Sequence, residues 1–391
     1  MMASPDPVLG ANALRSRSHN RQLVLGQVRA AGRIGRADIA RASGLSTQAV
    51  SNIIADLLED GMILERGRRP ASRGLPPVQY GINPRGGFAL GVEIRPDTVL
   101  AALMDLTGHI LFSDRRPLGD SGRATVTRTL QAIRSRAVAA TGIDPARVLG
   151  AGIVMPGPFG ATGIRDSGSE LPGWEDTDPR QWFAQALGLP VAVENDANAA
   201  AMAERIAGAA QGLESYAFLY FGTGLGLGVV SQGRLLTGAF GNAGEIGHVP
   251  MPGAEGPIPL EDAVSRLSVR RHLARAGIAA ESIDDLRRLH DARNPALEAW
   301  LARTARPLSA AVAMIENLFD PETVILGGAM PDSLIEAMIG KLVLQDRSVA
   351  NRPRRAQPRV QRGTCGRMTA TQGAAALALN RLFTPSIAAE S

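Results

Sequence analysis

"FGTGLGLGVV", residues 221–230, reads as a strand, a turn built from glycines and a second strand. Such a turn lets backbone N–H groups close around phosphate oxygens, so this hairpin is typical of one half of a nucleotide site. We expect the other half in "GVEIRPDTVLAALMD", residues 91–105, which reads as two strands joined by a tight turn at Arg95, Pro96 and Asp97. That turn has no glycine, so only one of the two halves is equipped to bind phosphate.

The length and composition are those of a globular protein with more than one domain. A chain of 391 residues is too long for one ordinary core. Its N-terminus has no continuous apolar region, and glycines interrupt the most apolar later stretch, residues 216–230, so we expect neither a signal peptide nor a membrane span. A single cysteine, Cys365, can form neither an intrachain disulfide nor a cysteine-based zinc site. These features predict a cytoplasmic protein.

The positive charge lies at one end of the chain. Residues 1–85 contain 12 arginines and no lysine against six acidic residues, a net charge of +6, whereas the total for the chain is +5. The remaining residues therefore carry a net charge of −1. Two interpretations are open: a solvated basic surface, or a nucleic-acid-binding segment attached to a nearly neutral ligand-binding body.

The spacing of apolar residues in this basic segment predicts a helix-turn-helix. One helix is expected over residues 20–32 and a second over residues 36–42, followed by a turn at Gly44. Ser46 is a natural N-cap for a third helix. Its inner stripe consists of Val50, Ile53, Ile54, Leu57 and Leu58.

The outer face of the third helix and a basic hairpin after it indicate DNA binding. Two strands are predicted on either side of a basic turn, which completes a winged helix-turn-helix. The polar residues expected to meet base edges are Thr47, Gln48, Ser51 and Asn52, and Ser46 is also expected at the DNA interface. The wing arginines expected to contact phosphates or the minor groove are Arg66, Arg68, Arg69 and Arg73, and Arg36 is also expected to bind DNA. The alternative is a small helical domain used only for packing or dimerisation.

After a linker at residues 83–87, strands and helices alternate in two similar sets, which predicts an α/β body of two lobes around a cleft. We therefore divide the chain into a DNA-binding domain, residues 1–84, and a body, residues 85–391. We assign residues 85–195 and a C-terminal helix at about 371–385 to lobe one, and residues 196–370 to lobe two.

Polar residues of the body stand where strands end. Asn195 and Asp196 follow a short strand, and as an isolated pair they read as helix N-caps, although they can also bind a ligand. Glu245 and His248 lie three apart beside glycines. They fit a surface loop, but a carboxylate and an imidazole are also the groups expected to grip vicinal sugar hydroxyls.

Five motifs in order give the chain a resemblance to the ROK family of repressors and sugar kinases. They are "GIVMPGP" at 152–158, "ENDANAAAMAE" at 194–204, "GTGLGLGVV" at 222–230, "GNAGEIGH" at 241–248 and "ETVILGG" at 322–328. The resemblance covers residues from about 15 to about 385 and implies an actin-like, ribonuclease H-like fold. A winged helix-turn-helix before such a body resembles the repressor branch, which includes xylose and N-acetylglucosamine repressors.

The resemblance also implies a sugar site. In the family, the motif that holds Asn195 and Asp196 contributes sugar contacts, and Asp196 matches the carboxylate that deprotonates the attacking hydroxyl in the kinases. Glu245 and His248 match two further sugar contacts, and Glu261 in "PLEDAVS" matches another.

Two departures from the family pattern bear on activity. The first phosphate loop of the kinases reads Asp, any residue, Gly, Gly, Thr, whereas this chain has Glu93 to Asp97. Pro96 removes an N–H donor and Asp97 adds a negative charge, so sugar binding without phosphoryl transfer is expected. The second departure follows His248, where the cysteine-rich zinc loop of many members is replaced by "VPMPGAEGPIPLE". We therefore expect no metal and no cofactor.

These observations predict a regulator, not an enzyme. It would be a repressor that binds a palindromic double-stranded DNA operator as a homodimer or homotetramer and responds to a small sugar effector. One alternative is an ATP-dependent sugar kinase with an accessory N-terminal domain. Another is a regulator whose sugar site has decayed and which responds to a protein partner.

Overall fold

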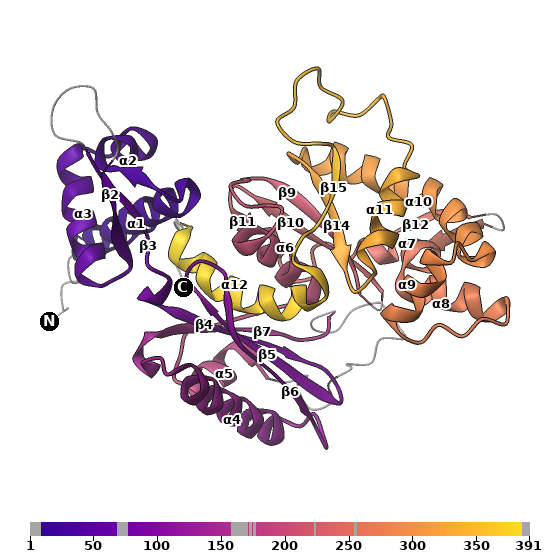
Figure 1. The fold of residues 1–391 in the computed structure, drawn as a ribbon, viewed down its shortest axis with the longest axis horizontal. Helices are drawn as coiled ribbons and strands as arrows, with labels where there is room; N and C mark the ends of the chain where they lie inside the picture. Colours follow the sequence, from indigo (N-terminus) through magenta and orange to yellow (C-terminus); the bar gives the residue numbers. More distant parts are fainter. Residues whose placement is uncertain are drawn as a thin grey trace, which may run out of the picture.

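The computed structural model describes residues 9–68, 77–157, 171, 174, 177–222, 224–253 and 256–384. It has a small N-terminal domain and a body of two lobes, each built around a five-stranded sheet (Figure 1). The α/β fold with a winged helix-turn-helix before a two-lobed body confirms the predicted fold class. No helix in the described ranges combines the length and the apolar character that crossing a bilayer requires.

The N-terminal domain has the predicted helices and strands, with shifted ends. Its elements are α1 (Leu9–Ala31), β1 (Ile34–Gly35), α2 (Arg36–Ser43), α3 (Thr47–Glu59), β2 (Ile63–Arg68) and β3 (Val78–Ile82). The strands form a sheet in the order β1-β3-β2. Gly44 ends α2 with φ 70°, a conformation that glycine adopts without strain. The first helix starts eleven residues before the predicted Asn20.

Lobe one is a mixed sheet in the order β6-β5-β4-β7-β8. Its elements are β4 (Phe88–Ile94), β5 (Thr98–Asp105), β6 (Ile110–Pro117), α4 (Arg123–Thr141), β7 (Val148–Val154), α5 (Pro179–Leu187) and β8 (Val191–Glu194). β4 pairs antiparallel with β5 and parallel with β7. Every residue of β4 is buried, as expected for a central strand covered on both faces.

Lobe two is a sheet in the order β11-β10-β9-β14-β15 with a group of helices beside it (Figure 1). The strands are β9 (Tyr216–Phe221), β10 (Leu225–Ser231), β11 (Arg234–Leu235), β14 (Val324–Gly328) and β15 (Val360–Arg362). A separate hairpin pairs β12 (Pro250–Gly253) with β13 (Gly256–Pro259). The helices are α7 (Leu260–Val264), α8 (Arg266–Arg275), α9 (Ile283–Asp291), α10 (Pro295–Phe319) and α11 (Asp332–Gly340).

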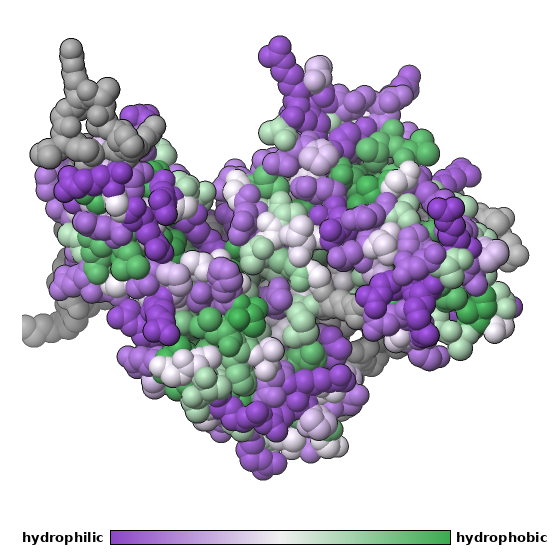
Figure 2. All heavy atoms as spheres, in the orientation of Figure 1, coloured by the Kyte–Doolittle hydropathy of each residue, from purple (hydrophilic) through white to green (hydrophobic). Residues whose placement is uncertain are grey.

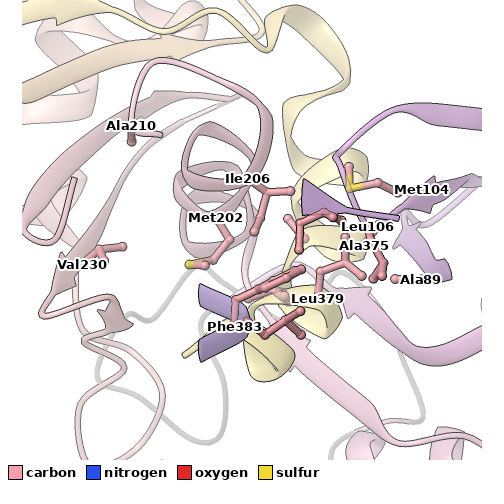
Figure 3. Close-up of a cluster of buried hydrophobic side chains, with 14 of the residues drawn as sticks. Ala89, Met104, Leu106, Met202, Ile206, Ala210, Val230, Ala375, Leu379 and Phe383 are labelled. Carbon is pink, nitrogen blue, oxygen red and sulfur yellow. The ribbon is translucent and has the colours of Figure 1, made fainter. Parts of the chain in front are cut away.

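Two helices, α6 (Asp196–Ala207) and α12 (Thr369–Phe383), pack against each other and connect the lobes. A Cβ on Gly373 would lie 1.8 Å from the Ala199 carbonyl oxygen, so these helices touch backbone to backbone. α12 begins and ends two residues before the predicted range 371–385. Side chains of both helices belong to the apolar cluster that Figure 3 shows.

The N-terminal domain is docked on the body. Residues 83–87, predicted as a linker, contain a 3₁₀ turn, and the Asn83 side chain donates a 2.6 Å hydrogen bond to the Gly61 carbonyl. Arg147 of lobe one donates hydrogen bonds to the carbonyls of Asp60 and Gly86. One buried apolar cluster runs from α1–α3 to α6 and α12. Figure 2 shows an open notch between this domain and lobe two.

Candidate functional site

The first part of the candidate site is the N-terminal turn of α6. Asn195 is its N-cap, and its Oδ1 accepts a hydrogen bond of 2.8 Å from the Asn198 amide. Asp196 follows, and its Oδ1 accepts one of 2.9 Å from the Ala197 amide. The N-cap interpretation of Asn195 therefore holds. The side-chain nitrogen of Asn195 (Nδ2) and the second carboxylate oxygen of Asp196 (Oδ2) have no role in the cap.

The Asp196 carboxyl group has an unusual protonation equilibrium. Burial, and next the charge of Glu93, raise the pKa of Asp196 from 3.8 to about 6. Glu93 is the next-to-last residue of β4 and is only 7% exposed. A carboxyl group with a pKa near 6 is a site for accepting or sharing the proton of a ligand hydroxyl.

The second part of the site comes from lobe two. His248 lies between two carboxylates, with Nε2 3.6 Å from Glu245 Oε2 and Nδ1 3.8 Å from Glu261 Oε1. Glu245 precedes the 3₁₀ turn Ile246–His248, and Glu261 lies in the first turn of α7. Burial, and less strongly the Glu261 charge, raise the pKa of Glu245, whereas His248 opposes this shift.

Glycines bring the two parts close together. A Cβ on Gly157 would lie 3.7 Å from Glu245 Oε1 and 3.8 Å from Asn195 Cβ, so this one position borders both parts. A Cβ on Gly222 would lie 3.2 Å from Asp196 Oδ2. The structure thus brings the five predicted sugar-site residues close together, with Asn195 and Asp196 on one side and Glu245, His248 and Glu261 on the other. Their side chains offer several acceptors and few donors, which suits a ligand rich in hydroxyl groups.

An ion pair between Arg95 and Glu93 anchors the turn at residues 95–97. The Arg95 guanidinium lies 2.6 Å from Glu93 Oε1, and Thr371 of α12 donates a 2.7 Å hydrogen bond to Glu93 Oε2. The Arg95 amide donates to the Thr98 carbonyl at 2.8 Å, which leaves this amide unable to bind phosphate. The sequence indicated the lost glycines but not the Glu93–Thr371 contact, because these residues are 278 positions apart.

Tyr220 is a site residue that the sequence did not indicate. It is 5% exposed in β9, and a Cβ on Gly222 would lie 2.9 Å from its ring. Asp196 is therefore next to an aromatic ring as well as to Glu93. Burial raises the pKa of the Tyr220 phenol well above its usual value, so this hydroxyl stays protonated and can donate. Its only signal in the sequence is its position just before the glycine hairpin.

The predicted base-reading residues lie on the first two turns of α3. Thr47, Gln48 and Asn52 are exposed, and Ser51 is half-buried. The Gln48 side chain donates a 3.0 Å hydrogen bond to Asn52 Oδ1. Ser46 instead caps the helix, because its hydroxyl accepts from the Ala49 amide at 3.2 Å. The exposed residues can form base contacts, and the Ser46 hydroxyl, which accepts the capping bond, keeps its O–H as a donor.

The predicted arginines have different surroundings. Arg36 Nε donates a 3.0 Å hydrogen bond to the Tyr80 hydroxyl, and Arg66 donates one of 3.0 Å to the Ile82 carbonyl. These bonds orient both guanidinium groups and leave other N–H groups on each. Arg68 is exposed on β2. The two remaining arginines of the prediction, Arg69 and Arg73, lie outside the described residues.

Comparisons with known proteins agree with this architecture. The ROK family model matches residues 89–381, and a winged helix-turn-helix DNA-binding model matches residues 17–63. The xylose repressor of Bacillus spizizenii is 25% identical over 80% of this chain and 83% of its own length.

Two solved structures are similar. A ROK family transcriptional regulator, a homologue of the E. coli MLC protein, has 25% identity and a TM-score of 0.73, with 95% of this chain and 98% of that one covered. The ROK hexokinase of Thermus thermophilus has 30% identity and a TM-score of 0.58, with 74% and 97% covered. The regulator thus aligns with nearly the whole chain, and the kinase with about three quarters of it.

Proposed function

Because the chain belongs to the ROK family and has a winged helix-turn-helix before the ROK body, we propose that it is a sugar-responsive transcriptional repressor. It binds double-stranded operator DNA through α3 and the wing, and a monosaccharide or derivative in the cleft changes its operator affinity. It acts in the cytoplasm as a homodimer or homotetramer, because a winged protein with two-fold symmetry matches a palindromic operator. Its targets are genes of carbohydrate uptake or catabolism.

The observation that carries this proposal is one group of hydrogen-bond acceptors beside an incomplete phosphate cradle. Gly157 lies next to both Asn195 and Glu245, in a chain whose α3 presents an uncharged polar face. The similarity to xylose repressors makes D-xylose the first sugar to test. D-glucose, N-acetyl-D-glucosamine and their 6-phosphates complete a panel that separates sugar size, acetamido groups and phosphate.

The test measures sugar and DNA binding on the full-length protein. Melting temperatures with each sugar identify the effector. A duplex selected by the protein from a random-sequence library serves as operator. We expect one sugar to raise the melting temperature and to lower operator affinity by about 5- to 150-fold, the usual range of allosteric coupling. The proposal is wrong if the selection yields no preferred duplex, or if no sugar changes binding to that duplex.

The kinase alternative rests on relatives such as the Thermus hexokinase, which is similar to this chain over the body. Against it, we propose that the chain has no phosphoryl-transfer activity. The Arg95–Pro96–Asp97 turn provides no open backbone cradle, and its amide at Arg95 is bonded within the turn. Phosphoryl transfer depends on positioning and charge stabilisation of the phosphoryl group, so binding can persist without catalysis.

A further inference from the structure

Arg29, on α1 of the N-terminal domain, contacts three elements of the body at once. Its guanidinium donates hydrogen bonds of 2.6 Å to the Ile206 carbonyl and 3.2 Å to the Leu106 carbonyl. It also lies 4.4 Å from the centre of the Phe383 ring. These partners belong to the end of α6, the turn after β5 and the end of α12. Leu106, Ile206 and Phe383 are part of the cluster in Figure 3.

Ile206 lies at the opposite end of α6 from the sugar site. Asp196 is the first residue of the helix and Ile206 is next to its last, a separation of about 15 Å along the axis. The last carbonyls of a helix have no partner within it and carry partial negative charge, so a guanidinium is a favourable ligand there. A single helix therefore has the sugar site at one end and the N-terminal domain at the other.

The first turn of α6 is packed closely against both α12 and β10. A Cβ on Gly373 would overlap the Ala199 backbone on the α12 side, and one on Gly228 would lie 2.6 Å from the Ala197 carbonyl oxygen on the β10 side. Both contacts lie in the first turn of the helix. Because residues 196–207 form one uninterrupted helix, a displacement of the first turn also moves Ile206.

α1 is fixed to the end of α12 as well. Gln22 donates a 2.8 Å hydrogen bond to the Arg381 carbonyl, and a Cβ on Gly26 would lie 2.6 Å from the Phe383 carbonyl oxygen. Figure 1 shows α12 running from the N-terminal domain to the space between the lobes. Any shift of α6 against α12 must therefore change the hydrogen bond that Arg29 donates to the Ile206 carbonyl.

We propose that Arg29 is the positioning residue that couples the sugar site to the DNA-binding domain, through the rigid helix α6. A sugar that draws Asp196 towards Glu245 moves α6, and Arg29 transfers this movement to α1 and so to α3. The inference rests on the proposed function, because it assigns the route by which the same cleft controls DNA binding. Burial, with a smaller effect of Arg205, lowers the Arg29 pKa to about 10, so this group is still charged at neutral pH.

The test compares Arg29→Met with the wild-type full-length protein. The ligand is D-xylose, or D-glucose or N-acetyl-D-glucosamine if one of those stabilises the protein instead. Calorimetry gives its Kd for the free protein and its Kd for the protein bound to the selected duplex. The ratio of the two values is the coupling factor, expected at about 5 to 150 in the wild type. In Arg29→Met we expect a factor below about 2, with the Kd for free protein changed less than about twofold. Arg29→Lys, which keeps the charge and one donor, should give an intermediate factor.

The matched control is Arg17→Met, because Arg17 is also on α1 but pairs with Asp56 of α3, not with the body. It should keep the wild-type factor. Gly26→Ala tests the docking of α1 on α12 without removing the Arg29 side chain, because its Cβ would push α1 away from the Phe383 carbonyl, and it should lower the factor too. A wild-type factor in folded Arg29→Met and Gly26→Ala overturns the coupling role while the proposed function stands. A factor of 1 in the wild type overturns both.

Discussion

The guanidinium of Arg95 lies 2.6 Å from the carboxylate of Glu93, at the turn where the ROK kinases have glycines. Because Thr371 holds the second oxygen of Glu93, the ion pair ties this turn to α12. The Arg95 amide is bonded to the Thr98 carbonyl, and an arginine side chain stands where a glycine would leave open space. The ion pair and the Thr371 hydrogen bond thus form a structural contact between β4 and the helix that joins the lobes.

The first prediction concerns catalysis. Purified protein should produce no ADP with any sugar that raises its melting temperature, and ATP alone should leave that temperature unchanged. A coupled assay of ADP release over the sugar panel measures both the rate and its sugar dependence. Sustained ADP release that disappears in Asp196→Asn would show a working kinase and contradict the regulator-only proposal.

The second prediction concerns the pH dependence of stability. The pKa of Asp196 in the folded state, about 6, lies above its ordinary value of 3.8. Its contribution to stability is therefore complete below pH 3.8 and is lost as pH rises through 6. Asp196→Asn does not titrate, so its free energy of unfolding relative to wild type should increase by up to about 3 kcal/mol between pH 4 and pH 7. Urea unfolding at four pH values measures this difference, and a constant difference would refute the raised pKa.

The third prediction concerns the sugar pocket. Asp196→Ala or Glu245→Ala should weaken sugar binding by roughly 10- to 100-fold, because each removes a half-buried carboxylate that accepts ligand hydroxyls. Calorimetry with the sugar identified by thermal shift measures the change. Glu281→Ala is the control, since the Glu281 side chain is 77% exposed and pairs only with Arg270 among the described partners. Unchanged affinity in both pocket variants would place the sugar elsewhere.

The sequence predicted elements whose signals are local. Ser46 was identifiable as a cap because a serine preceded a stripe of apolar residues, and its hydroxyl does accept the Ala49 amide. The start of α12 was misplaced because its N-cap position, Met368, makes no side-chain capping bond and the helix is buried nearly all round. Gly373 lies within this helix and permits the contact with Ala199.

Contacts between distant segments could not be predicted in this way. The family motifs led to the five predicted sugar-site residues, which come from separate segments of the chain and lie close together in the structure. Nothing in the spacing of residues 83–87 indicated that the N-terminal domain is docked on the body, because the docking depends on Arg29 and Arg147 reaching backbone carbonyls far along the chain. Every residue has a backbone carbonyl, so the sequence does not indicate which carbonyl an arginine will reach.

The last prediction separates base reading from phosphate contact. Gln48→Ala or Asn52→Ala should relax base preference at particular operator positions, because these exposed side chains carry amides suited to adenine edges. The double variant Arg66→Ala and Arg68→Ala should instead weaken binding to all duplexes and reduce the salt dependence by about one unit for each lost phosphate contact. Repeating the duplex selection and titrating the selected duplex at several salt concentrations distinguishes the two effects. Since Arg66 also bonds the Ile82 carbonyl, Arg68→Ala alone is the control for loss of wing structure. If the α3 variants changed the salt slope and the arginine variants changed base preference, the docking of α3 in the major groove would be wrong.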